Sequence, residues 1–141
     1  MKALLLSLTV SLAGCGPAAH RDVDTAAAPG TFLITAEQIE KSGARTAWQV
    51  LKQSAPMLQT SEDRNGRPSK LGRRGRTSFL LDDAPTILLD GVRLPDFRTL
   101  DDIDAPSIMT IYIYDGIEGT TYYGTNAGSG VIVIKTKSGQ S

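Results

Sequence analysis

The sequence is poor in the residues that most often carry chemistry. Its 141 residues include one cysteine and one histidine, Cys15 and His20. A single cysteine excludes a disulfide framework within the chain, because such a framework needs an even set of cysteines. His20 lies in an N-terminal stretch without regular periodicity, so it has no fixed geometry with a serine or a carboxylate. We therefore expect no enzymatic activity and no catalytic residue.

The chain also has no surplus of charge, because fifteen Lys and Arg balance fifteen Asp and Glu. Binding to nucleic acid through counterion release needs a basic surplus, so we expect no nucleic-acid partner. The aspartates lack the spacing of a calcium-binding loop, and we expect no metal. The stretch Gly124–Gly130 precedes a predicted strand, whereas a phosphate-binding loop opens a helix. The sequence therefore predicts no cofactor.

Long hydrophobic runs are absent except for a short one at the N-terminus. Met1-Lys2 is followed by an apolar run from Ala3 to Leu12, which ends in the small residues of Leu12-Ala-Gly-Cys15. The run is too short to span a bilayer, which takes roughly 20 residues, and its order is typical of a secretory signal. Leu12-Ala-Gly-Cys15 resembles the lipobox of bacterial lipoproteins, in which the chain is cut before a cysteine whose thiol carries a diacylglycerol.

This resemblance implies that residues 1–14 are a lipoprotein signal peptide and that Cys15 is lipidated. Residues 15–30 contain Ala, Pro and Gly without a sustained period, which predicts a flexible tether. Gly16 stands where enterobacterial lipoproteins retained in the inner membrane have Asp, so we expect a lipid anchor in the outer membrane, on its periplasmic face. The alternative is an ordinary signal followed by an unmodified cysteine.

The remaining chain predicts a single domain over residues 31–138, followed by a tail at 139–141. Helices are predicted from Thr35 and from Thr46, because each threonine has a Gln three positions later, as in a capping box. Strands are predicted at 31–35, 79–81, 86–89, 109–113 and 131–134. The last of these strands is apolar on both faces, which favours a central position. We expect an α+β fold with a small mixed β-sheet and short helices.

Three further local features are predicted. Residues 59–76 lose the hydrophobic period and carry six Lys and Arg side chains, so we expect a mobile basic loop. Trp48 is expected to pack at the edge of the second helix. Asp90-Gly91 predicts a hairpin turn, because both positions tolerate positive φ, and residues 99–102 predict a capped turn.

Several short strings, in order along the chain, resemble the plug domain of TonB-dependent outer-membrane receptors. They are Ile34-Thr-Ala-Glu-Gln-Ile39, Thr46-Ala-Trp-Gln-Val-Leu51, Arg74-Gly75, Ile87-Leu-Leu-Asp-Gly-Val92, Leu100 to Ile103, Ser107-Ile-Met-Thr-Ile-Tyr-Ile113, Tyr123-Gly124 and Gly128-Ser-Gly-Val-Ile-Val-Ile-Lys-Thr-Lys137, the last of which stands where the family has "GGVINITTK". The family's "PGV" is Ala55-Pro-Met57 here, and its glutamate in the late strand is Thr110.

The resemblance implies a plug-like fold and a module without transport activity of its own, because family plugs continue into a long barrel and this chain ends at Ser141. It implies an interaction module accessory to an outer-membrane TonB-dependent transport system, with an outer-membrane β-barrel or a periplasmic protein as partner. The arginine guanidinium donates forked hydrogen bonds and the tyrosine ring is a rigid contact group, so both suit a protein interface. We expect such contacts at Arg73, Arg74, Arg76, Tyr122 and Tyr123. The alternative function is a small-ligand-binding lipoprotein that uses the tyrosines near residues 112–123.

Overall fold

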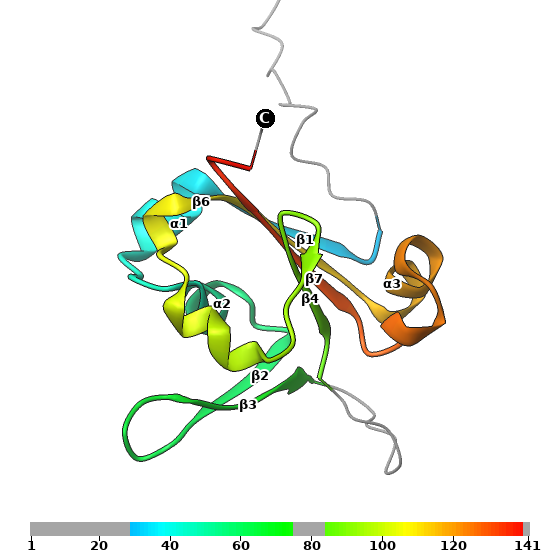
Figure 1. The fold of residues 1–141 in the computed structure, drawn as a ribbon, viewed down its shortest axis with the longest axis horizontal. Helices are drawn as coiled ribbons and strands as arrows, with labels where there is room; N and C mark the ends of the chain where they lie inside the picture. The colour runs from blue at the N-terminus through cyan, green and yellow to red at the C-terminus, as the bar shows by residue number, and fades with distance from the viewer. Residues whose placement is uncertain (1–28, 75–83, 140–141) are drawn as a thin grey trace, which may run out of the picture.

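The fold is built on a five-stranded mixed sheet and a separate two-stranded hairpin (Figure 1). The computed structural model describes residues 29–74 and 84–139. The sheet has the order β1-β6-β7-β4-β5, and its strands are β1 (Thr31–Thr35), β4 (Thr86–Leu89), β5 (Val92–Arg93), β6 (Ile108–Tyr114) and β7 (Val131–Thr136). β4 runs parallel to β7, and the other neighbours are antiparallel. The predicted mixed sheet, with β7 at its centre, is confirmed.

The helices begin where threonine and aspartate side chains cap them. α1 (Ala36–Ser42) has the predicted capping box between Thr35 and Gln38, and Gly43 ends it in the left-handed conformation. α2 (Ala47–Ser54) starts after Thr46, whose hydroxyl accepts from the N–H of Gln49. The side chain of Gln49 accepts from the Arg45 N–H and not from Thr46. The second capping box is therefore only half formed.

One helix was not expected from the sequence. α3 (Gly116–Tyr123) follows β6, and the Asp115 carboxylate caps it by accepting from the N–H groups of Ile117 and Glu118. Short 3-10 helices complete the described chain: η2 (Phe97–Asp102), η3 (Ala105–Ser107) and η4 (Thr125–Ala127). The turn predicted at 99–102 begins earlier, because Asp96 and not Thr99 supplies the capping oxygen.

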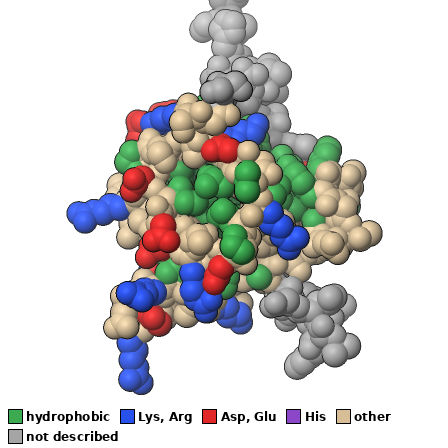
Figure 2. All heavy atoms as spheres, in the orientation of Figure 1, with side chains coloured by type: hydrophobic (Ala, Val, Ile, Leu, Met, Phe, Trp, Pro, Cys, Tyr) green, Lys and Arg blue, Asp and Glu red, His purple; other side chains and the backbone are tan. Residues whose placement is uncertain are grey.

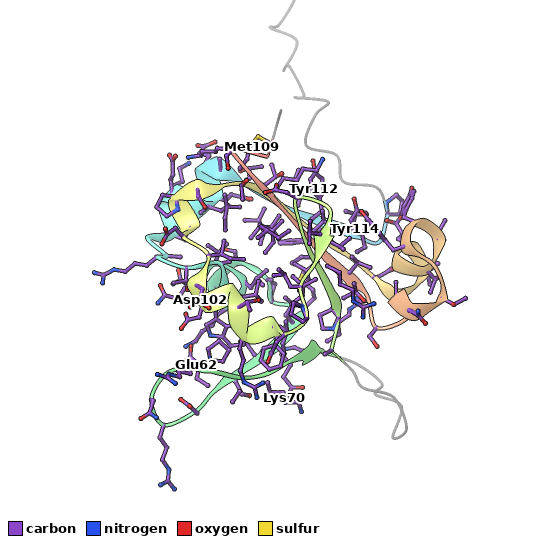
Figure 3. The ribbon with its side chains drawn as sticks, in the orientation of Figure 1. Glu62, Lys70, Asp102, Met109, Tyr112 and Tyr114 are labelled. Carbon is purple, nitrogen blue, oxygen red and sulfur yellow. The ribbon has the colours of Figure 1, made fainter. Side chains whose placement is uncertain are left out.

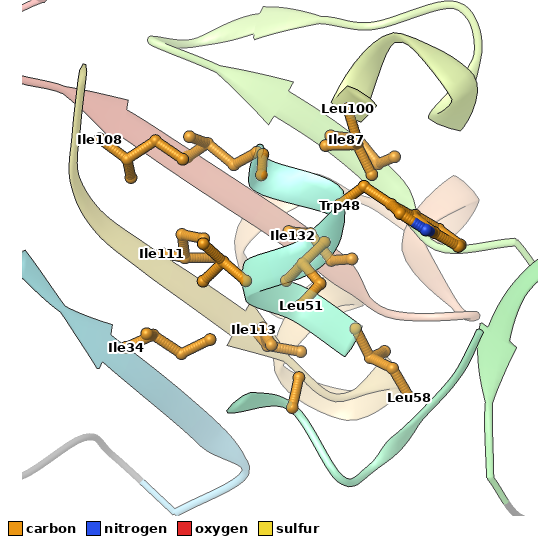
Figure 4. Packing of buried hydrophobic residues seen from close by; sticks show 14 of the residues in the cluster. Ile34, Trp48, Leu51, Leu58, Ile87, Leu100, Ile108, Ile111, Ile113 and Ile132 are labelled. Atoms are coloured by element: carbon orange, nitrogen blue, oxygen red, sulfur yellow. The ribbon is translucent and has the colours of Figure 1, made fainter. Parts of the chain in front are cut away.

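The main core fills the space between one face of the sheet and α2, as Figure 4 shows. Ile111 and Ile113 alternate with tyrosines along β6 and point to this face, where they meet Leu51 of α2. Trp48 is 0% exposed, so its predicted position at the edge of the helix is wrong. It is covered because the Phe97 ring of η2 lies 6.3 Å from it and because its Nε1–H donates to Glu62 of β2.

The predicted mobile basic loop is also wrong, since most of it forms a hairpin. β2 (Leu58–Glu62) and β3 (Pro68–Arg73) pair antiparallel, and Leu58 and Leu71 are buried in the main core. The Asp63 carboxylate accepts from the N–H groups of Asn65 and Arg67 and so closes the turn. The strand predicted at 79–81 lies outside the described residues, as does Arg76.

The predicted turn after β4 is confirmed, and it holds the end of β7. Asp90 and Gly91 have φ of 47° and 85°. The Asp90 N–H donates to the Ile134 carbonyl, and its carboxylate accepts from the N–H and the hydroxyl of Thr136 at 2.8 and 2.7 Å. These hydrogen bonds, the one from the hydroxyl first, hold the pKa of Asp90 below its ordinary value. The carboxylate thus ties the turn to the central strand after the β4–β7 ladder has ended.

Candidate partner-binding surfaces

Alternation along β6 sends its tyrosines to the second face of the sheet, away from the main core. Tyr112 and Tyr114 stack with ring centroids 6.3 Å apart and an interplanar angle of 15°. Figure 3 shows both of them on the side of the sheet that α3 occupies. Burial, followed by the neighbouring tyrosines, raises the pKa of Tyr114. These rings form a rigid platform on the second face.

α3 adds two tyrosines to this platform. The rings of Tyr122 and Tyr123 lie 5.9 and 5.7 Å from the ring of Tyr114. Their side chains are 63% and 43% exposed, so most of this aromatic area faces solvent. We refer to Tyr112, Tyr114, Tyr122 and Tyr123 as the tyrosine surface. Sequence reasoning selected these residues, and the structure brings all four together.

Glycines hold α3 close to the rest of the fold. A Cβ on Gly116 would lie 2.2 Å from the carbonyl oxygen of Gly128, and one on Gly119 would lie 2.8 Å from that of Ala127. Both contacts are shorter than a side chain allows, so backbone approaches backbone directly. At the start of β1, the Thr31 hydroxyl donates to the Glu118 carboxylate of α3. The helix is therefore attached by close packing and caps more than by buried side chains.

Beside the tyrosine surface lie a cation and a polar group that sequence reasoning did not select. The Lys135 ammonium stands 5.4 Å from the centroid of the Tyr112 ring, in cation–π geometry. The Thr110 hydroxyl is buried and has no hydrogen-bond partner in the part of the chain that the structure describes. Thr110 is paired with Lys135 in the sheet register, so both residues belong to the same end of the second face. The sequence does carry a signal for both residues. Thr110 lies two positions before Tyr112, and Lys135 lies two positions after Val133, so each shares the face of its neighbour in the strand.

Two of the predicted arginines, Arg73 and Arg74, lie on the β2–β3 hairpin and just after its end. Arg73 is half-buried, and its Cδ would be 3.3 Å from a Cβ on Gly130, next to the start of β7. Arg74 is exposed, and its N–H donates to the Met57 carbonyl. We refer to residues 58–74 as the basic hairpin. It is a second exposed surface, and it belongs to a different sheet from the tyrosine surface.

The described residues contain no arrangement that suits a metal. In the ranges 29–74 and 84–139, no three His, Cys, Asp or Glu side chains gather as metal ligands would. Cys15 and His20 lie outside the described residues. Within the same ranges, no helix has both the length and the apolar character that crossing a membrane takes.

Comparison with known proteins identifies the fold. The family model described as TonB-dependent Receptor Plug Domain matches residues 23–131. No curated protein matches the chain. Among solved structures, a mutant ferric enterobactin receptor from Pseudomonas aeruginosa in complex with enterobactin has 22% identity and a TM-score of 0.57, over 79% of this chain and 18% of that one.

Two other structures share the fold. The siderophore receptor PirA from Pseudomonas aeruginosa has 24% identity and a TM-score of 0.53, over 79% of this chain and 19% of the receptor. The RagAB peptide importer in its open-open state has 18% identity and a TM-score of 0.58, over 76% and 12%. This chain thus spans less than a fifth of the length of each of these proteins. With a family model that matches most of its sequence, the chain belongs to the TonB-dependent receptor plug domain family.

Proposed function

We propose that this chain is a lipid-anchored, periplasm-facing plug module, accessory to an outer-membrane TonB-dependent transport system, that binds an outer-membrane β-barrel or a periplasmic protein. The observation that carries the proposal is the tyrosine surface, on which Tyr122 and Tyr123 leave 63% and 43% of their side chains in solvent. Tyrosine is enriched at protein interfaces, where its ring adds apolar area and its hydroxyl a hydrogen bond. A partner that covers this surface would complete the second face of the sheet.

The anchor is the second part of the proposal. Leu12-Ala-Gly-Cys15 after an apolar run supports lipidation at Cys15. A flexible stretch such as residues 15–30 would hold the domain roughly 20–25 Å from its anchor. Mass spectrometry of the mature protein should find a diacylglyceryl cysteine at its N-terminus. A mature chain that begins elsewhere, and is released into the periplasm, would contradict the lipid anchor but not the proposal of a protein partner.

The proposal assigns no enzymatic activity and no cofactor to the chain. Support comes from the distribution of its polar groups in the described residues, where carboxylates are used as helix caps, turn closers and strand ties, as Asp115, Asp63 and Asp90 are. Addition of calcium, magnesium, zinc or a chelator should leave the melting temperature unchanged, because only an ion bound by the folded state raises it.

Crosslinking in cells tests the partner. A photoreactive amino acid at position 122 or 123 should join the protein to an outer-membrane β-barrel or a periplasmic protein, whereas one at Lys41, on α1, should not. Replacing Arg73, Arg74 and Arg76 by Ser should weaken the association and its dependence on salt. Recovery of monomer alone from both tyrosine positions would contradict the proposal.

The second candidate is a small-ligand-binding lipoprotein. It is favoured by one observation, the Lys135 ammonium fixed over the Tyr112 ring beside the stacked Tyr114. A cation next to an aromatic platform suits an anionic ligand with a flat apolar part. Absence of crosslinks, together with a raised melting temperature in a screen of such ligands, would favour this candidate.

A further inference from the structure

Charge is distributed unevenly in this neutral chain. The basic hairpin holds five of the fifteen Lys and Arg residues and two of the fifteen Asp and Glu residues, which leaves ten cations and thirteen anions elsewhere. Figure 2 shows several Lys and Arg side chains at the lower end of the molecule, over β2 and β3, with Asp and Glu side chains among them, while other Lys and Arg side chains lie at its left, top and right. The hairpin is therefore a positive projection from a body of opposite charge.

The two carboxylates of the hairpin form no ion pair with its cations in the part of the chain that the structure describes. Glu62 accepts from the Trp48 Nε1–H at 2.9 Å and pairs with Lys52 of α2 at 2.7 Å, which lowers its pKa. Asp63 accepts from two backbone N–H groups of the turn, and these lower its pKa. Among the described residues, none of the five hairpin cations forms an ion pair. The five are Arg64, Arg67, Lys70, Arg73 and Arg74.

The cations are spread along the hairpin. Arg64 and Arg67 lie at the turn, Lys70 lies in the middle of β3, and Arg74 follows its end. At about 3.3 Å per residue, the distance from the turn to Arg74 is roughly 20 Å. A flat surface that meets the turn end-on would leave Lys70 and Arg74 in water. A groove or lumen that takes the hairpin lengthwise would meet all of them.

The face that carries Lys70 offers little to an apolar partner. Lys70 is opposite Ser61 in the register, and Gln59 and Ser61 on the same face are exposed, whereas the buried Leu71 points to the core. We propose that the basic hairpin is an electrostatic docking arm that lies lengthwise in a carboxylate-lined groove of a partner protein. The inference rests on the proposed function, since it gives the charge and shape of the partner's site.

A labelled peptide of ten glutamates provides a direct test, because in extended form it covers the length of the hairpin. Its binding to the full chain carrying Cys15→Ser is measured by fluorescence anisotropy at 20 and 200 mM salt. Three double variants each remove two exposed cations: Arg64→Ser with Arg67→Ser at the turn, Lys70→Ser with Arg74→Ser along the stem, and Arg45→Ser with Arg93→Ser outside the hairpin as the matched control.

The turn pair and the stem pair should each weaken binding about fivefold at 20 mM salt and reduce its salt dependence, while the control stays within about twofold. If the control variant weakened binding equally, the peptide would be attracted by the overall charge of the protein and not by the hairpin, and the inference would be overturned. The inference would also be overturned if only the turn pair weakened binding of the peptide and if the protein without these substitutions bound vesicles of 30% phosphatidylglycerol. A flat lipid surface would then be the occupant. If crosslinking from the tyrosine positions failed but the peptide bound as expected, the proposed function would be contradicted and the inference about the hairpin would stand.

Discussion

The two faces of the sheet are made from the same strands, yet they are used differently. The core on one face holds seventeen buried apolar residues, which come from the sheet and from the elements that cover it, such as α2, the hairpin and η2. The other face has three buried apolar residues, Ala127, Val131 and Val133, with Leu88, Tyr112 and Tyr114 only partly covered. Each fully buried aliphatic or aromatic side chain contributes about 1.5–3 kcal/mol. Most of the folding free energy therefore comes from the first face.

The largest expected effect comes from breaking the first face. Trp48→Ala removes the largest fully buried side chain and leaves Glu62 without its indole donor, so unfolding should cost about 3–5 kcal/mol less. Urea denaturation measures the loss. Trp48→Phe keeps most of the volume and should cost less than Trp48→Ala. A loss below about 1 kcal/mol for Trp48→Ala would mean that the two faces contribute alike.

The attachment of α3 gives the next effect, on the second face. Gly119→Ala places a Cβ 2.8 Å from the Ala127 carbonyl oxygen and 3.2 Å from a Val131 methyl group. Overpacking typically costs about 1–3 kcal/mol, against a gain of about 1 kcal/mol in helix propensity. We expect a net loss of about 1 kcal/mol in thermal or urea unfolding. Gly128→Ala is the matched control, because its Cβ would meet only the Thr125 carbonyl oxygen, at 3.9 Å.

The tie between Asp90 and Thr136 belongs to the sheet itself and so supports both faces. Asp90→Asn keeps a residue that tolerates positive φ but removes a charged acceptor, at a cost of about 1 kcal/mol at pH 7. The pKa of Asp90 is lowered in the folded state, so this stabilisation is complete above the ordinary pKa, near 4, and is lost as pH falls through the folded value.

The melting temperatures of the unsubstituted protein and of the Asp90→Asn variant should therefore converge as the pH is lowered from 7 to below 3. A difference that is the same at both ends of this range would contradict the assignment of the charge to this tie.

The smallest effect on stability is expected at the exposed tyrosines. Tyr122→Ser combined with Tyr123→Ser should change the free energy of unfolding by less than about 0.5 kcal/mol per site, as exposed substitutions usually do. The same pair should abolish crosslinking at neighbouring positions of α3. The first face would then account for stability and the second face for association with a partner. A large loss of stability would instead make the tyrosines part of the core.

Much of the sheet follows from local sequence, because Ile and Val at alternating or consecutive positions mark β6 and β7 and threonines mark the helix starts. The basic hairpin was missed because only Leu58 and Leu71 of its strands are buried hydrophobic side chains, so polar residues conceal the period. Its turn does carry a signal, Asn65-Gly66, which is among the strongest for a hairpin.

α3 and the burial of Trp48 depend on tertiary structure. The helix contains Gly116 and Gly119, which lower helix propensity, and it forms because the aspartate cap and the close approach to Gly128 compensate. Trp48 was placed at an edge because one helix alone offers no cover, and its cover comes from Phe97 and Glu62, far along the chain from one another. For the proposed partner-binding residues, the sequence predicts the residue types, whereas their grouping on one surface depends on the fold.

The position of β7 has a consequence for the order in which the protein folds. It is the middle strand of the sheet, with β6 on one side and β4 on the other, yet it comes last in sequence among the strands that the structure describes. The tie from Asp90 to Thr136 spans 46 positions, and contacts between such distant residues form late. A growing chain can pair β1 with β6 but cannot join β4 to them until residues 131–136 have been made. Folding of the sheet is therefore delayed until residues 131–136 have been made.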